Sequence, residues 1–195
     1  KHNMPIRVLS SFSDGEGTLV TLEENVMQKR LVSGIAFSRE EAIISLTGVP
    51  RKVGLEGHIL GKVSDAMIEI DMIAQNATAQ DTVDFTFTVP RREHLKTMAI
   101  IEDLAKTLGA FSVKTNAKVA KLSLVGIGMR SHAGVASTMF RSLGEAGIHI
   151  QMITTSEIKI SVVVDESHLE QGIRAVHSAF NLDKLPLAPI KAVIE

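Results

Sequence analysis

The chain has 195 residues, in which 21 Lys and Arg stand against 22 Asp and Glu, and 45% of the residues are hydrophobic. This nearly neutral balance offers no basic stripe for nucleic acid, and the absence of Tyr and Trp removes the best stacking residues. Without cysteine the chain has no disulfide framework and no thiolate metal site. No apolar run reaches the roughly 18 residues of a membrane span. We therefore expect a cytoplasmic protein without membrane or nucleic-acid partners.

Residues 1–30 have no counterpart later in the chain. Ile6, Val8 and Leu9 predict a short strand, and the stretch SFSDGEGTLVTLEEN predicts a turn or linker with solvated acidic residues. Residues 31–37 predict a further strand that precedes the first repeat.

Residues 42–118 follow the order strand, helix, strand, strand, helix, strand. Period-2 alternation of apolar residues marks the strands, and apolar residues three or four apart mark the helices. Gly48 is expected to end the first strand, and Gly109 to cap the second helix. The predicted elements are a strand from residue 42, a helix at 55–67, strands at 68–75 and 83–89, a helix at 95–108 and a strand at 111–115.

The same order recurs in residues 119–195. Ala120, Leu122 and Leu124 repeat an earlier strand, and IHIQMITTS at 148–156 repeats IEIDMIAQN at 68–76. A closing strand is expected at 187–194. The sequence thus predicts an α+β fold with two tandem ferredoxin-like βαββαβ units, each with an antiparallel sheet and helices on one face. Free sheet edges favour a homodimer.

The loop after the first strand of each repeat is the best candidate for a site, because a glycine loop that enters a helix offers free N–H groups to an anion. VGIGMRSHAGV contains Gly126 and Gly128, but Ser131 stands where a dinucleotide fingerprint requires its third glycine. We interpret the loops instead as small carboxylate pockets, in which N–H groups near Gly54 or Gly134 would bind a free amino acid.

No other group of residues in the sequence indicates a metal site or a catalytic site. The seven histidines include no pair at metal-ligand spacing beside a carboxylate, so no metal site is expected. His132 lies in the candidate loop and is as consistent with an ordinary loop residue as with a ligand contact. No serine has a nucleophile-elbow context. We predict no active site.

The sequence resembles the C-terminal regulatory part of bacterial aspartokinase, which carries two tandem ACT domains. GIGMRSHAGVA and IHIQMITTSEIKISV carry the resemblance in the second repeat, and IDMIAQN and DFTFTVPR carry it in the first. MPIRVLSSFSDGEGTLV is similar to the end of the kinase domain. The resemblance implies a kinase end or linker at 1–32, a first ACT domain at 33–118 and a second at 119–195.

The resemblance also implies a function. End-product amino acids, threonine and/or lysine, would inhibit phosphorylation of L-aspartate by ATP in an attached catalytic domain or subunit, which would use ATP and Mg²⁺. The chain itself would need no cofactor. Gln75 would hydrogen-bond an ammonium or a threonine hydroxyl, and Glu157 would pair with a lysine ε-ammonium. The implied effector contacts are Arg51, Gly54, Ile70, Asp71, Gln75, Asn76, Thr78, Met129, Ser131, His132, Val135, Ala136, His149, Ile150, Ser156 and Glu157.

One departure from the family pattern affects the choice of effector. Related sequences usually have an acidic residue in the first loop, whereas this chain reads GVPRKVG, with Arg51 and Lys52. These cations would repel lysine at this loop and could attract a carboxylate, so we expect threonine as the effector, alone or with lysine at a separate pocket. Two alternatives stay open: a tandem ACT sensor of another biosynthetic enzyme or one that stands alone, and a catalytic or RNA-binding ferredoxin-like domain. The RNA alternative needs exposed aromatics, whereas the alternation around Phe85 and Phe87 predicts core packing.

Overall fold

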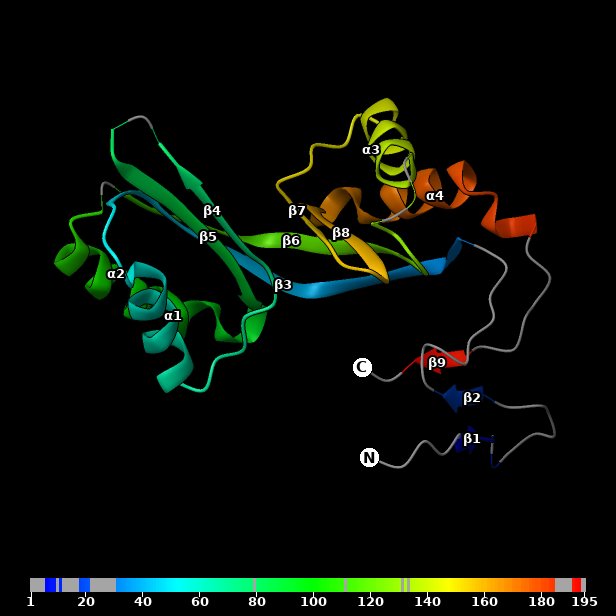
Figure 1. Ribbon diagram of the computed structural model, residues 1–195, viewed down its shortest axis with the longest axis horizontal. Coiled ribbons are helices and arrows are strands. Elements are labelled where there is room, and N and C mark those ends of the chain that lie inside the picture. Colours follow the sequence, from blue (N-terminus) through cyan, green and yellow to red (C-terminus); the bar gives the residue numbers. More distant parts are fainter. Residues whose placement is uncertain are drawn as a thin grey trace.

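The computed structural model describes residues 6–9, 11, 18–21, 31–78, 80–110, 112–130, 132, 134–184 and 191–193. Its main body is an elongated α+β structure built on a six-stranded antiparallel sheet, and a small three-stranded sheet lies beside one end (Figure 1). The predicted fold class is confirmed.

Two long strands, β3 (Val32–Pro50) and β6 (Ser112–Gly126), run through both repeats. The strand order is β4-β5-β3-β6-β8-β7. Unit 1 combines the second half of β3 and the first half of β6 with β4 (Ile73–Ala77) and β5 (Thr82–Pro90). Unit 2 combines the other halves with β7 (Met152–Thr155) and β8 (Lys159–Asp165). Each unit is therefore four-stranded, and the two share their central strands.

Two helices cover one face of each unit. Helices α1 (Leu55–Asp65) and α2 (His94–Leu108) belong to unit 1, and α3 (Val135–Glu145) and α4 (Leu169–Ala179) belong to unit 2. The two helix pairs lie at opposite ends of the main body (Figure 1). Gly109 caps α2 with a φ of 72°, as predicted. Each helix buries an apolar stripe against its own unit.

Each unit has its own apolar core, and a third cluster joins the two. Phe85 and Phe87 are 1% and 0% exposed, which confirms that they pack in the core and are not available for stacking on RNA bases. The third cluster combines Ile43 and Met72 of unit 1 with Val119, Met152 and Val163 of unit 2. This inter-unit core fixes the helix-free surfaces of the units against each other.

Several predicted boundaries were wrong. The strand predicted at 31–37 and the strand predicted from residue 42 are one strand, and Gly48 marks an irregularity inside it rather than its end. The predicted strand at 111–115 likewise continues into the strand of the second repeat. Continuity was hidden because polar residues interrupt both apolar patterns at the crossing between units, where the pairing of β3 with β6 shifts register.

The segments after α1 and α3 also differ from prediction. Residues 68–72 and 148–151 are not strand, and β4 and β7 begin only at Ile73 and Met152. Helix α1 ends at Asp65, because Met67 adopts a left-handed φ of 59°. The chain therefore turns sharply before each edge strand, and backbone bonds such as Asp71 N–H to Thr88 O (3.3 Å) hold the turn.

The closing strand predicted at 187–194 does not complete unit 2, whose fourth strand is the first half of β3. Residues 187–190 and 194 lie outside the described part of the chain, and β9 (Lys191–Val193) pairs in parallel with β2 (Thr18–Thr21). Strand β2 falls where a turn or linker was predicted, whereas β1 (Ile6–Val8) was predicted as a strand. The domain boundaries after residues 32 and 118 stay a prediction.

Candidate functional site

A cavity of about 510 Å³ lies at the N-terminus of α1 in unit 1. We call it the unit 1 cavity. Arg51 and Gly54 line it together with Gln75, so the structure brings together three of the predicted contacts from a loop and an edge strand. Gly54 permits the turn because its φ is 83°, and the N–H of Arg51 donates to Asp81 O at 3.1 Å. The loop is thereby tied to the β4–β5 turn.

The charges that line the unit 1 cavity are balanced. Arg51 and Lys52 supply two cations, and Glu56 and Asp81 supply two carboxylates. The pKa of Glu56 is lowered, first by its own backbone N–H and then by a hydrogen bond from Gln75, against the opposing effect of desolvation and with a smaller contribution from Arg51. Such a lining suits a zwitterion better than a simple anion.

Sequence reasoning missed Glu56 and Asp81 as lining residues. A signal for Glu56 exists, since an acidic residue in the first turn of a helix interacts with the free N–H groups there. Because its own backbone N–H lowers the pKa of this carboxyl, Glu56 would compete with an effector carboxylate for that N–H group. The loop GVPRKVG lacks an acidic residue, but Glu56 of α1 and Asp81 of the β4–β5 turn supply carboxylates to the same cavity.

The other predicted contacts of unit 1 lie elsewhere. Asn76 pairs with Asp84 along the β4–β5 hairpin, and the hydroxyl of Thr78 lies 2.6 Å from that of Thr82 near the turn. Ile70 and Asp71 line a different cavity, which we call the inter-unit cavity. They are therefore not part of the unit 1 cavity.

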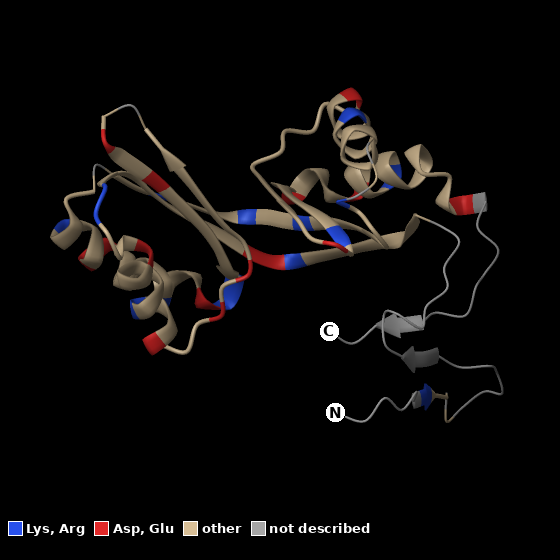
Figure 2. Ribbon diagram, viewed as in Figure 1, with Lys and Arg blue, Asp and Glu red and all other residues tan. Residues whose placement is uncertain are grey.

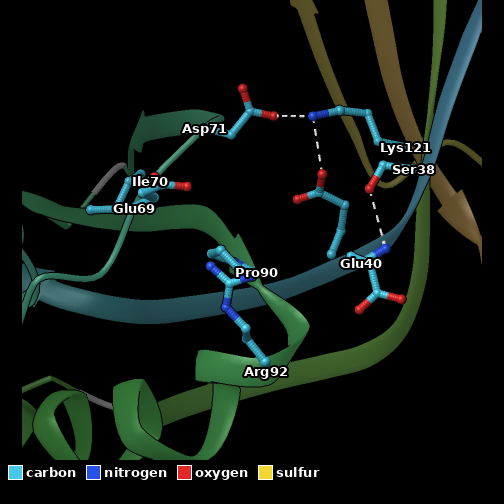
Figure 3. A pocket seen from close by; sticks show the side chains of 9 residues that line it. Ser38, Glu40, Glu69, Ile70, Asp71, Pro90, Arg92 and Lys121 are labelled. Atoms are coloured by element: carbon cyan, nitrogen blue, oxygen red, sulfur yellow. Dashed lines mark hydrogen bonds and ion pairs between the residues drawn. The ribbon is translucent and has the colours of Figure 1, made fainter. Parts of the chain in front are cut away.

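The inter-unit cavity has a volume of about 500 Å³ and lies where the units meet (Figure 3). The ammonium group of Lys121 lies between two carboxylates, bonded to Asp71 and 3.0 Å from Oε1 of Glu41. Desolvation lowers the pKa of Lys121, but the hydrogen bonds with Asp71 and Glu41 outweigh it and the net pKa is raised. Lys121 was not among the predicted residues, because a lysine on the helix-free face of a strand gives no sequence signal for a distant partner.

In unit 2, the glycine loop lies against the β7–β8 turn. The N–H of Gly126 donates to Ile158 O at 2.9 Å, and the N–H of Met129 donates to Glu157 O at 2.9 Å. The hydroxyl of Ser156 accepts from the N–H of Lys159 at 3.1 Å and so shapes the turn. The predicted contacts Met129, Ser156 and Glu157 are thus brought together from segments far apart in the sequence.

Other predicted residues of unit 2 have structural roles. Nδ1 of His132 lies 2.8 Å from Gly128 O, a contact that closes the loop. Met129 and Val135 are 3% and 4% exposed in the core, so only their backbone groups remain for a ligand. Ala136 and Ile150 are partly buried against the same core, His149 is exposed, and Ser131 lies outside the described residues.

No group of three or more histidine, aspartate or glutamate side chains within the part of the chain that the structure describes is placed to hold a metal ion. None of the helices in the described ranges is long and apolar enough to span a bilayer.

Two four-stranded units, each with two helices on one face and a glycine loop at its first strand–helix junction, define a tandem ACT-domain module. A family model described as "ACT domain" matches residues 122–180, within unit 2. The chain is 52% identical over 184 residues to an aspartate kinase from Pseudomonas putida, and this match covers 94% of the chain and 45% of the relative. The chain thus spans less than half the length of that protein. A full-length relative therefore contains much that this chain does not.

Solved structures agree with this match. A crystal structure of aspartokinase alpha and beta subunits contains a chain 51% identical, with a TM-score of 0.72, and the match covers 77% of this chain and 99% of that one. The ligand-free regulatory subunit of aspartate kinase from Thermus thermophilus is 30% identical, with a TM-score of 0.74 and the same coverage of both chains. The chain belongs to the aspartokinase family and corresponds to its regulatory part.

Proposed function

We propose that this chain is the allosteric regulatory part of an aspartokinase. It binds the end-product amino acids threonine and/or lysine and thereby inhibits phosphorylation of L-aspartate by ATP. The reaction takes place in a catalytic domain or subunit, which binds ATP and Mg²⁺. Membership of the family and the match to a regulatory subunit over nearly its whole length support this proposal.

The balanced lining of the unit 1 cavity is the observation that carries the proposal. A free amino acid brings one carboxylate and one ammonium, and the cavity offers Arg51 and Lys52 to the first and Glu56 and Asp81 to the second. Threonine adds only a neutral hydroxyl, for which Gln75 is the available amide. Lysine would bring an extra cation close to the two basic residues. We therefore assign threonine to unit 1.

Lysine fits unit 2 better. Glu157 is exposed on the β7–β8 turn, and its backbone carbonyl is already bonded to the glycine loop. The carboxylate is free to pair with an ε-ammonium, while N–H groups near Gly134, whose φ of 98° opens the N-terminus of α3, bind the α-carboxylate. The two units then respond to different end products.

A homodimer is part of the same proposal. Strands β4 and β7 are the outer strands of the sheet, and they carry Ile73 and Ile153 at equivalent positions of the two repeats. These side chains are 51% and 49% exposed. Large apolar side chains on outer strands favour edge pairing with a second copy.

Isothermal titration calorimetry tests the proposal on this chain. We expect heat with threonine and with lysine, and none with methionine as a control amino acid. Glu56→Gln should weaken threonine binding, because it removes the charge but keeps the shape, whereas Glu102→Gln on exposed α2 should not. If threonine gives no heat, lysine gives no heat and the two together give no heat, the proposed function is wrong.

Glu157→Ala separates the two assignments. We expect this variant to lose lysine affinity and to keep threonine affinity, because its side chain belongs to unit 2. If lysine affinity is unchanged, Glu157 does not bind the effector ammonium.

A further inference from the structure

We propose that Lys121, Glu41 and Asp71 form an ion-pair cluster that sets the relative position of the two units and transmits effector binding from one to the other. The positional part stands on the structure alone, and the regulatory part rests on the proposed function. We call these three residues the Lys121 cluster.

The three charges come from three different segments. Lys121 lies on the unit 2 half of β6 and Asp71 lies in the turn between α1 and β4 of unit 1, and their side chains point toward each other (Figure 3). Glu41 lies on β3 where the units meet. The side chain of Glu41 is only 10% exposed, that of Lys121 is 22% exposed, and that of Asp71 is 46% exposed. Partial burial reduces screening by solvent, so this cluster constrains geometry more than a surface pair does.

The cluster is located at the bend of the shared sheet, where basic and acidic residues follow one another along β3 (Figure 2). The pairing of β3 with β6 is irregular between Ser38 and Glu41 and again between Glu41 and Ile43. Bulges of this kind bend and twist a strand. Glu41 therefore sits at the point where a change of angle between the units would be absorbed, and Lys121 joins that point to the turn of unit 1.

Asp71 is also the neighbour of an inter-unit core residue. Met72 is 2% exposed and packs with Val119 and Val163 of unit 2. The N–H of Met72 donates to the hydroxyl of Thr88 at 3.0 Å, which ties the turn to β5. Apolar and ionic contacts thus hold the same short segment against unit 2.

The internal repeat shows that the fold does not require this cluster. In unit 1, Ile43 occupies the position of Lys121, and in unit 2, Gln151 occupies the position of Asp71. On that side the units are joined by a neutral contact, Asn116 Nδ2 to Gln151 Oε1 at 3.3 Å. Of these two equivalent positions in the described residues, Asp71 forms an ion pair and Gln151 forms a neutral hydrogen bond, so the cluster makes this part of the junction between the units asymmetric.

The cluster is continuous with the unit 1 cavity along the chain. Asp71 follows α1, whose N-terminal residues line the cavity, and precedes β4, which carries the lining residue Gln75. A ligand that draws α1 and β4 together displaces Asp71 relative to Lys121. Unit 2 and its glycine loop are then repositioned. The Lys121 cluster would in this way couple the unit 1 cavity to the glycine loop of unit 2, as an element with two arrangements that both sites bias.

Pulsed electron paramagnetic resonance tests the positional part without any ligand. The chain contains no cysteine, so Glu102→Cys on α2 and Ser178→Cys on α4 place two nitroxide labels, one on each unit. We expect a shifted or broader distance distribution in Lys121→Met and in Asp71→Asn. Lys114→Met is the matched control, because Lys114 is exposed on the same strand, and it should reproduce the parent distribution.

Asp71→Asn keeps the test decisive if Lys121→Met fails to fold, because it leaves Lys121 paired with the buried Glu41. The units remain joined by the inter-unit core and by Arg91, whose Nη1 lies 3.1 Å from Oε2 of Glu166. We therefore expect the cluster variants to change the angle between the two units and not to separate the units. If every folded cluster variant gives the parent distribution, the Lys121 cluster does not position the units.

Paired titrations test the regulatory part. We expect bound lysine to change the threonine affinity of the parent chain by about 5- to 150-fold, as in typical allosteric systems, and this factor should fall towards one in Lys121→Met. An unchanged factor overturns the transmission role. If neither amino acid binds the parent chain, the proposed function fails, and the resonance experiment still decides the positional role.

Discussion

Met67 ends α1 in a left-handed backbone conformation, with a φ of 59°, and its side chain is 90% exposed. The equivalent position of the second repeat is Gly147, with a φ of 71°. The turns are otherwise alike, since the N–H of Met67 donates to Ser64 O at 2.8 Å and that of Gly147 donates to Gly144 O at 2.9 Å. One repeat thus uses methionine where the other uses the residue that fits best.

The effect of Met67→Gly follows from two opposing terms. A non-glycine residue in the left-handed region costs about 1–2 kcal/mol, and glycine loses about 0.5–1 kcal/mol more backbone entropy on folding. Because the exposed side chain contributes little packing, we expect the difference, about 0.5–1 kcal/mol, as a gain in unfolding free energy. For a chain of this size that gain raises Tm by roughly 1–4 °C.

Thermal and urea unfolding followed by circular dichroism measure this gain. Met67→Ala is the control, because alanine keeps the backbone strain and should leave stability near that of the parent. Gly147→Met is the reverse experiment and should lower stability by a similar amount. A Met67→Gly variant no more stable than Met67→Ala would show that the backbone at this turn carries no strain.

Three further outcomes are expected. Gly126→Ala should lower the unfolding free energy in urea by at least about 1–3 kcal/mol, because its Cβ would lie 1.9 Å from Leu31 O; parent-like stability would contradict this close approach. Phe87→Ala should cost about 3–5 kcal/mol in the same assay, because Phe87 is fully buried, and a loss below 1 kcal/mol would refute its core role. Hydrogen bonds from the Ser167 side chain and backbone lower the pKa of Asp165 below its ordinary 3.8, so the stability it contributes is present above pH 3.8 and is lost as pH falls through the depressed pKa. Asp165→Asn should therefore flatten the fall of unfolding free energy in acid, and an unchanged acid limb would show that Asp165 does not contribute to it.

The periodicity of the sequence predicted each strand and helix better than it predicted their connections. Alternation around Ala42 and Ala120 predicted buried strands correctly, and both residues are fully buried. The alternation could not show that each strand continues past Glu41 or Lys118. Polar residues at a β-bulge interrupt the apolar pattern in the same way as the polar residues of a loop do. Strand pairing across the bulges, a non-local property, decides the continuity.

The candidate sites were predictable where chemistry is local and not where it depends on distant partners. Gly54 and Gly134 adopt positive φ at the helix N-termini, as a glycine loop that enters a helix suggests. Gly126 and Gly128 are also explained without a nucleotide, the first by close approach to Leu31 and the second by a φ of 66°. Asp71, by contrast, pairs with a lysine 50 residues away, a contact that no local pattern reveals.

The shared strands explain why differences between the repeats can have regulatory consequences. A module with two separate sheets could change one unit without the other, but β3 and β6 belong to both units and their backbone bonds are continuous on either side of the bend. The irregular pairing around Glu41 is where these strands pass from one unit to the other, so we expect a displacement of unit 1 relative to unit 2 to be taken up there. That position carries a buried carboxylate whose partner, Lys121, lies on the strand of unit 2. The charge that distinguishes the repeats therefore lies at the irregular pairing where the shared strands pass from one unit to the other.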